Sequence, residues 1–143
     1  MKTDIKVIPY ASPEWRTAVA LRENVLRVPL GQRFTEQELH EERDHIQIAA
    51  FSGAAIVATC VLVPEKPRVK VQRVAVEEHL RNKNIGADLM HFCEELIREQ
   101  GFGEIYCHAR DTAIPFYAKI GYQGEGDPFD EDGIPHLKMT KKL

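Results

Sequence analysis

The sequence predicts a single α/β (α+β) domain over residues 1–143, in which helices flank a mixed, largely antiparallel β-sheet. Apolar residues that alternate with polar ones recur along the chain, as in Val69–Val76, and this alternation is typical of half-buried strands. Helical spacing of apolar residues also occurs, most clearly over Ile85–Ile97. A two-residue hairpin signal, Ser52-Gly53, separates two adjacent strand-like segments, so these strands are expected to be antiparallel.

The elements of the N-terminal half have recognisable boundaries. Ser12-Pro13-Glu14 is typical of a helix start, because proline is favoured at the first helical position. Thr35 followed by Glu38 resembles a capping box, which predicts a short helix. We expect a strand over 5–9, a helix over 13–27, a helix-containing excursion over 28–44, and strands over 45–51 and 54–63.

The C-terminal half continues the alternation of strands and helices. Gly101 and Gly103 are expected to end the long helix that begins near residue 85. The acidic segment 124–133 is interpreted as a surface loop, since it lacks the spaced ligands and terminal glutamate of an EF-hand calcium site. We expect strands over 70–76, 104–110 and 134–141, and helices over 85–100 and 112–120.

Composition narrows the function classes. Hydrophobic residues make up 43% of the chain and charged residues 29%, and no apolar run approaches the roughly 20 residues of a membrane-spanning helix. The net charge of −3 argues against a nucleic-acid surface and favours a cationic small substrate. Without a signal-peptide pattern we expect a cytoplasmic protein with no membrane or nucleic-acid partner. Cys60, Cys93 and Cys107 stand singly in apolar patterns, which predicts buried reduced thiols and no metal site.

The segment Arg81-Asn82-Lys83-Asn84-Ile85-Gly86-Ala87 joins a strand to a helix and has the features of an anion-binding turn. Backbone N–H groups in the first turn of a helix lack intrahelical partners and lie at the positive end of the helix dipole. The arginine and lysine add full charges, the asparagines tolerate left-handed conformations, and the glycine and alanine leave the backbone accessible. A dinucleotide site is excluded here, because the Gly-x-Gly-x-x-Gly pattern is absent and hairpins precede the turn.

A second motif, Ala113-Ile114-Pro115-Phe116-Tyr117-Ala118-Lys119-Ile120-Gly121-Tyr122, lies in the predicted helix over 112–120 and just beyond it. With the turn at 81–87 and the elements between, it resembles the coenzyme-binding half of the GNAT superfamily, the acyl-coenzyme-A-dependent N-acetyltransferases. Segment 132–139 is similar to a subgroup of small bacterial GNAT proteins with loosely known substrates. The resemblance implies acetyl transfer from acetyl-CoA to a primary amine of a small molecule or peptide. Asn84 stands where the family usually has glycine.

The resemblance also implies where the coenzyme binds. Its pyrophosphate would contact the backbone amides of residues 82–87, and its pantetheine arm would pair with the strand edge at 74–76. Tyr117 matches the family position whose hydroxyl faces the coenzyme sulfur, where a phenol would act as general acid toward the departing thiolate. The coenzyme-binding residues expected on this basis are Val74, Ala75, Val76, Arg81, Asn82, Lys83, Asn84, Ile85, Gly86, Ala87 and Tyr117.

The acceptor side carries several candidate bases. The amine must lose a proton before it attacks, and His136 is predicted to be catalytic because histidine titrates near neutral pH. His108, Glu42 and Asp44 are the alternatives. The expected acceptor-binding residues are Arg22, Glu42, Arg73, His108 and Arg110. A non-catalytic coenzyme A-binding module is the alternative function, and an exposed final strand would allow a homodimer.

Overall fold

The computed structural model describes residues 2–81 and 83–143, and within them seven strands form one sheet in the order β1-β2-β3-β4-β5-β7-β6. Neighbouring strands in this described sheet are antiparallel apart from the parallel pair β4 and β5. The predicted fold class is therefore confirmed.

The strands have the following bounds: β1 (Asp4–Ile8), β2 (Ile46–Ser52), β3 (Ala55–Glu65), β4 (Arg68–Val76), β5 (Glu104–Arg110), β6 (Gln123–Glu131) and β7 (Ile134–Lys142). The helices are α1 (Pro13–Leu26), α2 (Glu36–Glu41), α3 (Ile85–Glu99) and α4 (Ile114–Lys119), with short 3-10 turns η1 (Val28–Leu30), η2 (Glu78–Leu80) and η3 (Asp111–Ala113).

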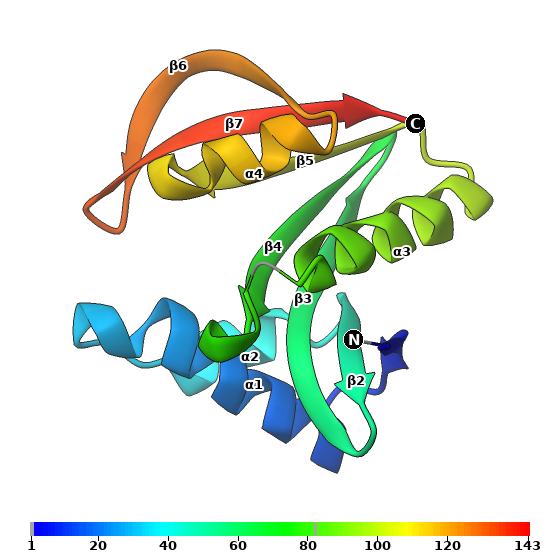
Figure 1. Cartoon of the computed structure of the whole chain (residues 1–143). Coiled ribbons are helices and arrows are strands. Elements are labelled where there is room, and N and C mark those ends of the chain that lie inside the picture. Colours follow the sequence, from blue (N-terminus) through cyan, green and yellow to red (C-terminus); the bar gives the residue numbers. More distant parts are fainter. Residues whose placement is uncertain (1, 82) are drawn as a thin grey trace.

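Helices cover both faces of the sheet. In β2, Ile48 and Ala50 belong to the core beneath α3, whereas Ala49 between them belongs to the core beneath α1. Successive residues of a strand point to opposite faces, so α1 and α3 lie on opposite sides. Helix α4 packs on β5 and β7 (Figure 1). The sheet is thus a central layer between two helical layers.

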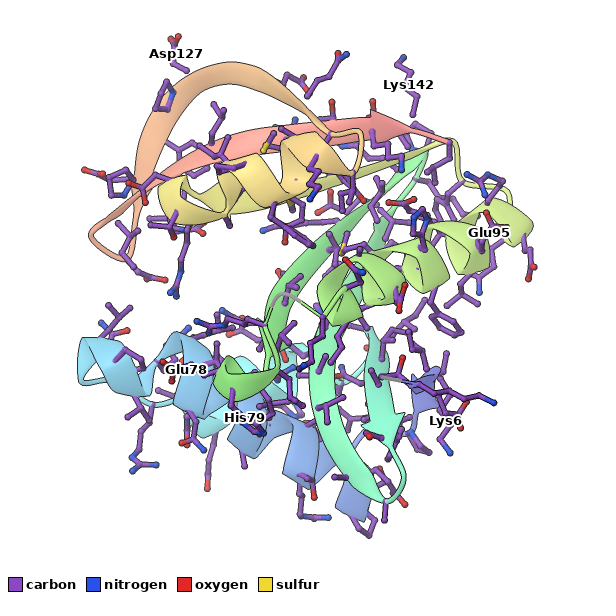
Figure 2. All side chains as sticks on the ribbon, in the orientation of Figure 1. Lys6, Glu78, His79, Glu95, Asp127 and Lys142 are labelled. Atoms are coloured by element: carbon purple, nitrogen blue, oxygen red, sulfur yellow. The ribbon has the colours of Figure 1, made fainter. Side chains whose placement is uncertain are left out.

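The acidic segment 124–133 is not a surface loop, and that prediction is wrong. Most of it belongs to β6, which pairs with β7 with a register shift between Glu125 and Phe129. Edge strands tolerate proline and charge, so Pro128 and the exposed Asp127 are compatible with a strand here. Figure 2 shows the Asp127 side chain at the outer side of the β6 arc. Because this strand carries no apolar alternation, its sequence does not reveal it.

The final strand is also not an edge strand. In the described sheet β7 lies between β5 and β6, and the edges are β1 and β6. The prediction that an exposed final strand would pair across a homodimer is therefore wrong, because the backbone of β7 is paired on both sides within the chain.

Candidate active site

Strands β4 and β5 are hydrogen-bonded neighbours over only part of their length. Arg68–Lys70 pairs with Glu104–Tyr106, whereas no pairing joins the described residues Val71–Val76 to Cys107–Arg110. Figure 1 shows the two strands diverging from the end near the C-terminus. We call this divergent region, 71–76 with 107–110, the β4–β5 fork. The edge of β4 that faces the fork can pair with an extended ligand, as the edges of sheets do.

A β-bulge bends β4 inside the fork. The register against β3 shifts so that Arg73 and Val74 together oppose Cys60. Arg73 has φ of 56°, a left-handed conformation that is uncommon for a residue with a side chain. Bulges of this kind increase the local twist and redirect side chains, and here the bulge sends Arg73 toward the α1 face.

Helix α3 begins beside the fork, and its N-terminus is not capped by its own N-cap side chain. Its N-cap residue, Asn84, has φ of 63° and ψ of 11°, and its side chain makes no capping hydrogen bond. The Asp88 N–H donates to the Asn84 carbonyl at 3.0 Å, so the amides of Ile85–Ala87 precede the first intrahelical hydrogen bond. Asparagine thus takes the left-handed conformation that glycine would take. The amides lie at the positive end of the helix dipole, which favours an anion.

The predicted cationic residues lie on the surface at this helix end. Arg81 and Lys83 are both exposed, so their charges are accessible to an anionic ligand. Asn82, which the sequence analysis placed in the same anion site, lies outside the described residues. Ala75 and Ile85 are buried, so their side chains are not accessible to a ligand.

Gly86 is in contact with α4. A Cβ atom on this residue would lie 3.2 and 3.3 Å from two ring atoms of Phe116 and 3.7 Å from Cγ2 of Val76. The two distances to Phe116 are tighter than ordinary van der Waals contacts, and the distance to Val76 is an ordinary one. The absence of a side chain at this position therefore allows the start of α3 to approach both α4 and the end of β4, which is a packing reason for the glycine beside the one expected from ligand approach.

Tyr117 projects from α4 into the core beside the fork. Its ring makes edge contacts with Phe116 at 5.0 Å and Tyr122 at 5.5 Å between centroids. The side chain is 6% exposed, and its hydroxyl lies near the thiol of Cys107. Burial, with an added contribution from Cys107, raises the pKa of Tyr117 well above its ordinary value. The Tyr117 hydroxyl is therefore protonated at neutral pH.

A buried carboxylate fixes the chain around Tyr117. Glu94 of α3 accepts hydrogen bonds from the Tyr122 hydroxyl at 2.7 Å and from Lys141 Nζ at 2.9 Å. Glu94 is 3% exposed, and burial raises the pKa of Tyr122. Glu94 was not among the predicted site residues, although its position four residues after the buried Met90 indicates that it faces the core.

On the opposite face, an ion cluster joins α1, α2 and the bulge. Glu42, directly after α2, accepts from Arg22 Nη2 at 2.5 Å and from Arg73 Nε at 3.0 Å. The side chains of Arg22 and Glu42 are 1% and 3% exposed. Burial lowers the pKa of Arg22, and Glu42 acts against this. The structure thus brings together three of the predicted acceptor-binding residues, but both carboxylate oxygens of Glu42 are engaged by arginine.

Phe34 lies at the centre of this cluster. The guanidinium carbons of Arg22, Arg27 and Arg73 are 5.1, 4.4 and 5.0 Å from its ring centroid. Glu38 accepts from Arg27 at 2.6 Å and lies 3.7 Å from Arg73. The Arg27 hydrogen bond lowers the pKa of Glu38 to about 2. Three arginines and two glutamates leave the cluster with one net positive charge.

Two histidines share one carboxylate on the β5–β7–β6 part of the same face. His108 Nδ1 lies 3.1 Å from Glu131 Oε1, and His136 Nε2 lies 3.6 Å from Glu131 Oε2. Phe129 lies against both rings, with centroid distances of 5.0 Å to His108 and 5.9 Å to His136. Glu131 was missed by the sequence analysis, which had placed it in the acidic loop.

One predicted acceptor-binding residue, Arg110, and one candidate base, Asp44, remain to be placed. Arg110 donates from Nη2 to the Leu26 carbonyl at 3.0 Å, which connects the end of β5 to the end of α1 across the fork. Asp44, an alternative base, has a side chain that is 88% exposed and lies 3.9 Å from Arg43. Asp44 is therefore not held in the cluster that contains Glu42.

The three cysteines are free and buried, as predicted, with Cys60 Sγ and Cys93 Sγ 3.4 Å apart. Among residues 2–81 and 83–143, no group of three or more His, Cys, Asp or Glu side chains is arranged to hold a metal ion. None of the helices in the same part of the chain is long and apolar enough to cross a membrane.

A family model described as an acetyltransferase (GNAT) domain matches residues 21–143. The chain belongs to the GNAT acetyltransferases. A candidate acetyltransferase of Bacillus subtilis (strain 168), BSU40680, is 30% identical over 130 residues, which cover 90% of this chain and 86% of that protein. The crystal structure of a candidate N-acetyltransferase from Lactobacillus plantarum superposes with a TM-score of 0.82 at 28% identity, covering 97% of this chain and 98% of that one.

More distant GNAT structures share the fold. The PaiA N-acetyltransferase of Thermoplasma acidophilum, determined in complex with coenzyme A, has a TM-score of 0.78 at 16% identity and covers 100% of both chains. The likeness in fold to this structure therefore extends over the whole of both chains.

Proposed function

We propose that this GNAT protein transfers an acetyl group from acetyl-CoA to a primary amine of a small molecule or peptide. The single observation that carries the proposal is the β4–β5 fork, which has an uncapped helix N-terminus at one side and a buried phenol beside it. Coenzyme and acceptor would enter from opposite faces of the sheet and meet in the fork.

The coenzyme would bind on the α3 face. Its pyrophosphate would accept hydrogen bonds from the first-turn amides of α3, with Arg81 and Lys83 adding charge at the surface. Its extended pantetheine arm would pair with the unpaired edge of β4 at Val74–Val76. The backbone conformation of Asn84 supports this proposal, because it leaves the amides after it directed out of the helix end.

Two groups of this chain would stabilise the charge that develops during transfer. When an amine attacks a thioester, charge develops first on the carbonyl oxygen, where a backbone N–H at Val74 in the bulge would act as donor. When the C–S bond breaks, Tyr117 would donate its proton to the departing sulfur. The position of Tyr117 beside the fork supports this role, and its hydroxyl is protonated at neutral pH and so has a proton to donate.

The acceptor would bind on the α1 face between the ion cluster and the two histidines. Arg73 and Arg110 lie on the two strands that border the fork, and Arg110 has no carboxylate partner among the described residues. Glu131, His108 and His136 supply groups that can receive protons. The surface therefore offers both signs of charge, which suits an acceptor with an amine and further polar groups.

The test measures coenzyme release from acetyl-CoA against a panel of polyamines, amino sugars, aminoglycosides and amino-terminal peptides. Coenzyme A should also raise Tm by several degrees at about 100 times its Kd, where linkage gives about 2.7 kcal/mol. The double variant Arg81→Glu/Lys83→Glu should weaken binding at least tenfold, with Lys142→Glu, on an exposed strand end, as the control. Coenzyme binding without release would favour the non-catalytic module, and no binding at millimolar concentration would refute both functions.

A further inference from the structure

The two histidines on the α1 face differ in how their ring nitrogens are used. Cross-strand pairs in the sheet place Arg110 opposite His136, and His136 opposite Phe129. His108 and Arg110 are two residues apart on β5, so their side chains lie on one face of the sheet. Both histidines, Glu131 and the acceptor-facing end of β5 therefore belong to one surface.

The ionised carboxylate of Glu131 determines which ring nitrogen of His108 carries the proton. Partial burial acts to raise the pKa of Glu131, but the hydrogen bond and charge of His108, with the charges of His136 and Lys70, outweigh burial and lower it. An ionised carboxylate only accepts hydrogen bonds, so the nitrogen that faces it must carry the proton. His108 Nδ1 therefore donates to Glu131 Oε1, and in the neutral ring Nε2 is left with its lone pair.

Neither ring nitrogen of His136 is directed at the open surface. Its Nδ1 lies 2.7 Å from the Ile134 carbonyl, which only accepts, so Nδ1 carries a proton. Its Nε2 faces Glu131 rather than the open surface, and its side chain is 6% exposed. The side chain of His108, by contrast, is 28% exposed, and its Nε2 has no hydrogen-bond partner in the described part of the chain.

We propose that His108 is the base that deprotonates the acceptor amine, and that Glu131 is a positioning residue that holds its Nδ1–H. This inference rests on the proposed acetyl transfer, and it replaces His136 with His108 in the predicted role. The carboxylate that fixes one ring nitrogen also stabilises the imidazolium that forms when the other nitrogen takes a proton. His136 Nε2 lies 3.6 Å from the other oxygen of Glu131.

The protons balance as follows. The acceptor arrives as an ammonium ion and gives one proton to His108 Nε2, which later releases it to solvent. The neutral amine forms a C–N bond with the acetyl carbon, and the C–S bond breaks with its electron pair moving to sulfur. Tyr117 donates a proton to that sulfur and is reprotonated by the second proton that leaves the nitrogen. The products are the amide, the free thiol and one proton in solution.

The other groups around His108 are compatible with this role. The ring packs near Phe129 at 5.0 Å and Tyr106 at 6.0 Å between centroids, and Lys138 is its cross-strand partner. Tyr106 donates to Glu65, so its hydroxyl is not directed at His108. Lys138 lies 3.8 Å from Glu125 and 4.9 Å from the Tyr106 ring centroid. Glu131 is therefore the charged group that contacts the imidazole.

The kinetic test compares His108→Gln, Glu131→Gln and, as a matched control, His91→Gln, whose side chain is 67% exposed on α3. With the best amine of the panel, His108→Gln should lower kcat by roughly 10²-fold and Glu131→Gln by roughly tenfold, with the coenzyme-induced Tm shift unchanged. The loss in His108→Gln should shrink as pH rises, because free amine then becomes abundant. A His108→Gln variant within threefold of wild type, or a comparable loss seen only in His136→Gln, would overturn the assignment.

A second readout does not depend on turnover. Nitrogen-15 NMR of the histidine side chains, assigned with the same variants, should find the neutral His108 ring protonated at Nδ1 in the coenzyme A complex. A ring protonated at Nε2 would overturn the inference even in an active enzyme. Coenzyme A binding with no release by any amine would instead refute the proposed acetyl transfer, and the proton transfer with it.

Discussion

The Glu42 carboxylate should contribute several kcal/mol to the free energy of unfolding, and the variant Glu42→Gln tests this. The substitution keeps the shape of the side chain but removes the charge that Arg22 faces at 2.5 Å, where the two side chains are 1% and 3% exposed. Removing one partner of a buried ion pair costs about 3–5 kcal/mol, because the other charge stays buried without compensation. Because both side chains are almost fully buried, solvent screening does not reduce this energy.

The expected change in Tm follows from chain size. A domain near 150 residues loses about 2–4 °C per kcal/mol, so Glu42→Gln should lower Tm by roughly 10 °C. The matched control is Glu41→Gln, at the exposed neighbouring position where the carboxylate accepts from Gln37, and it should change Tm by less than about 2 °C. Differential scanning calorimetry of both variants against wild type measures the difference.

A double variant separates the ion pair from the packing of the two side chains. Arg22→Met/Glu42→Leu removes both buried charges, so it should be more stable than Glu42→Gln although it changes more atoms. Arg73 retains Glu38 at 3.7 Å in that protein. If Glu42→Gln lowers Tm by less than 3 °C, the interpretation of Glu42 as a charge-compensating residue is refuted. It is also refuted if the double variant loses as much stability as the single variants Arg22→Met and Glu42→Leu lose together.

Two further predictions concern Tyr117 and Glu38. Tyr117→Phe removes one oxygen and keeps the ring packing, so turnover should fall roughly 10²-fold with coenzyme affinity and Tm nearly unchanged; a wild-type kcat would refute the general acid. The pKa of Glu38 is about 2 in the folded protein, against an ordinary value of 4.5. The ionised carboxylate therefore adds to the free energy of unfolding above pH 4.5, and this contribution is lost as the pH falls toward 2. In urea unfolding, the free energy of unfolding of wild type should exceed that of Glu38→Gln by about 2 kcal/mol at pH 6, and the two values should be equal near pH 2. The same difference at both pH values would contradict the lowered pKa of Glu38.

Local sequence signals predicted the elements whose causes are local. The capping box at Thr35 is present with both hydrogen bonds, and the strand over 104–110 has the predicted bounds. Asn84 adopts the left-handed conformation expected from its position in the turn. Caps, helical periodicity and turn residues act within a few positions of the chain, so the sequence itself contains enough information to place them.

Features that depend on distant partners could not be predicted in the same way. Strand β6 is a strand because β7 pairs with it, and nothing in its own acidic sequence indicates that pairing. Glu131 was therefore absent from the candidate site, although His108 and His136, its two partners, were both named. The hairpin between β2 and β3 turns at residues 53–54, one residue later than predicted, since Ser52 pairs with Ala55.

The positive φ of Arg73 connects the ion cluster on the α1 face to the backbone of β4 in the fork. A left-handed conformation with a side chain costs on the order of 1 kcal/mol or more, and it persists only where surrounding contacts hold it. Here Glu42 and Glu38 hold the guanidinium from the α1 face, while the next peptide group, at Val74, borders the coenzyme face. The ion cluster on the α1 face therefore fixes the backbone on which the coenzyme would pair. Disrupting Glu42 should raise the KM for acetyl-CoA as well as lower Tm, although Glu42 lies on the opposite side of the sheet.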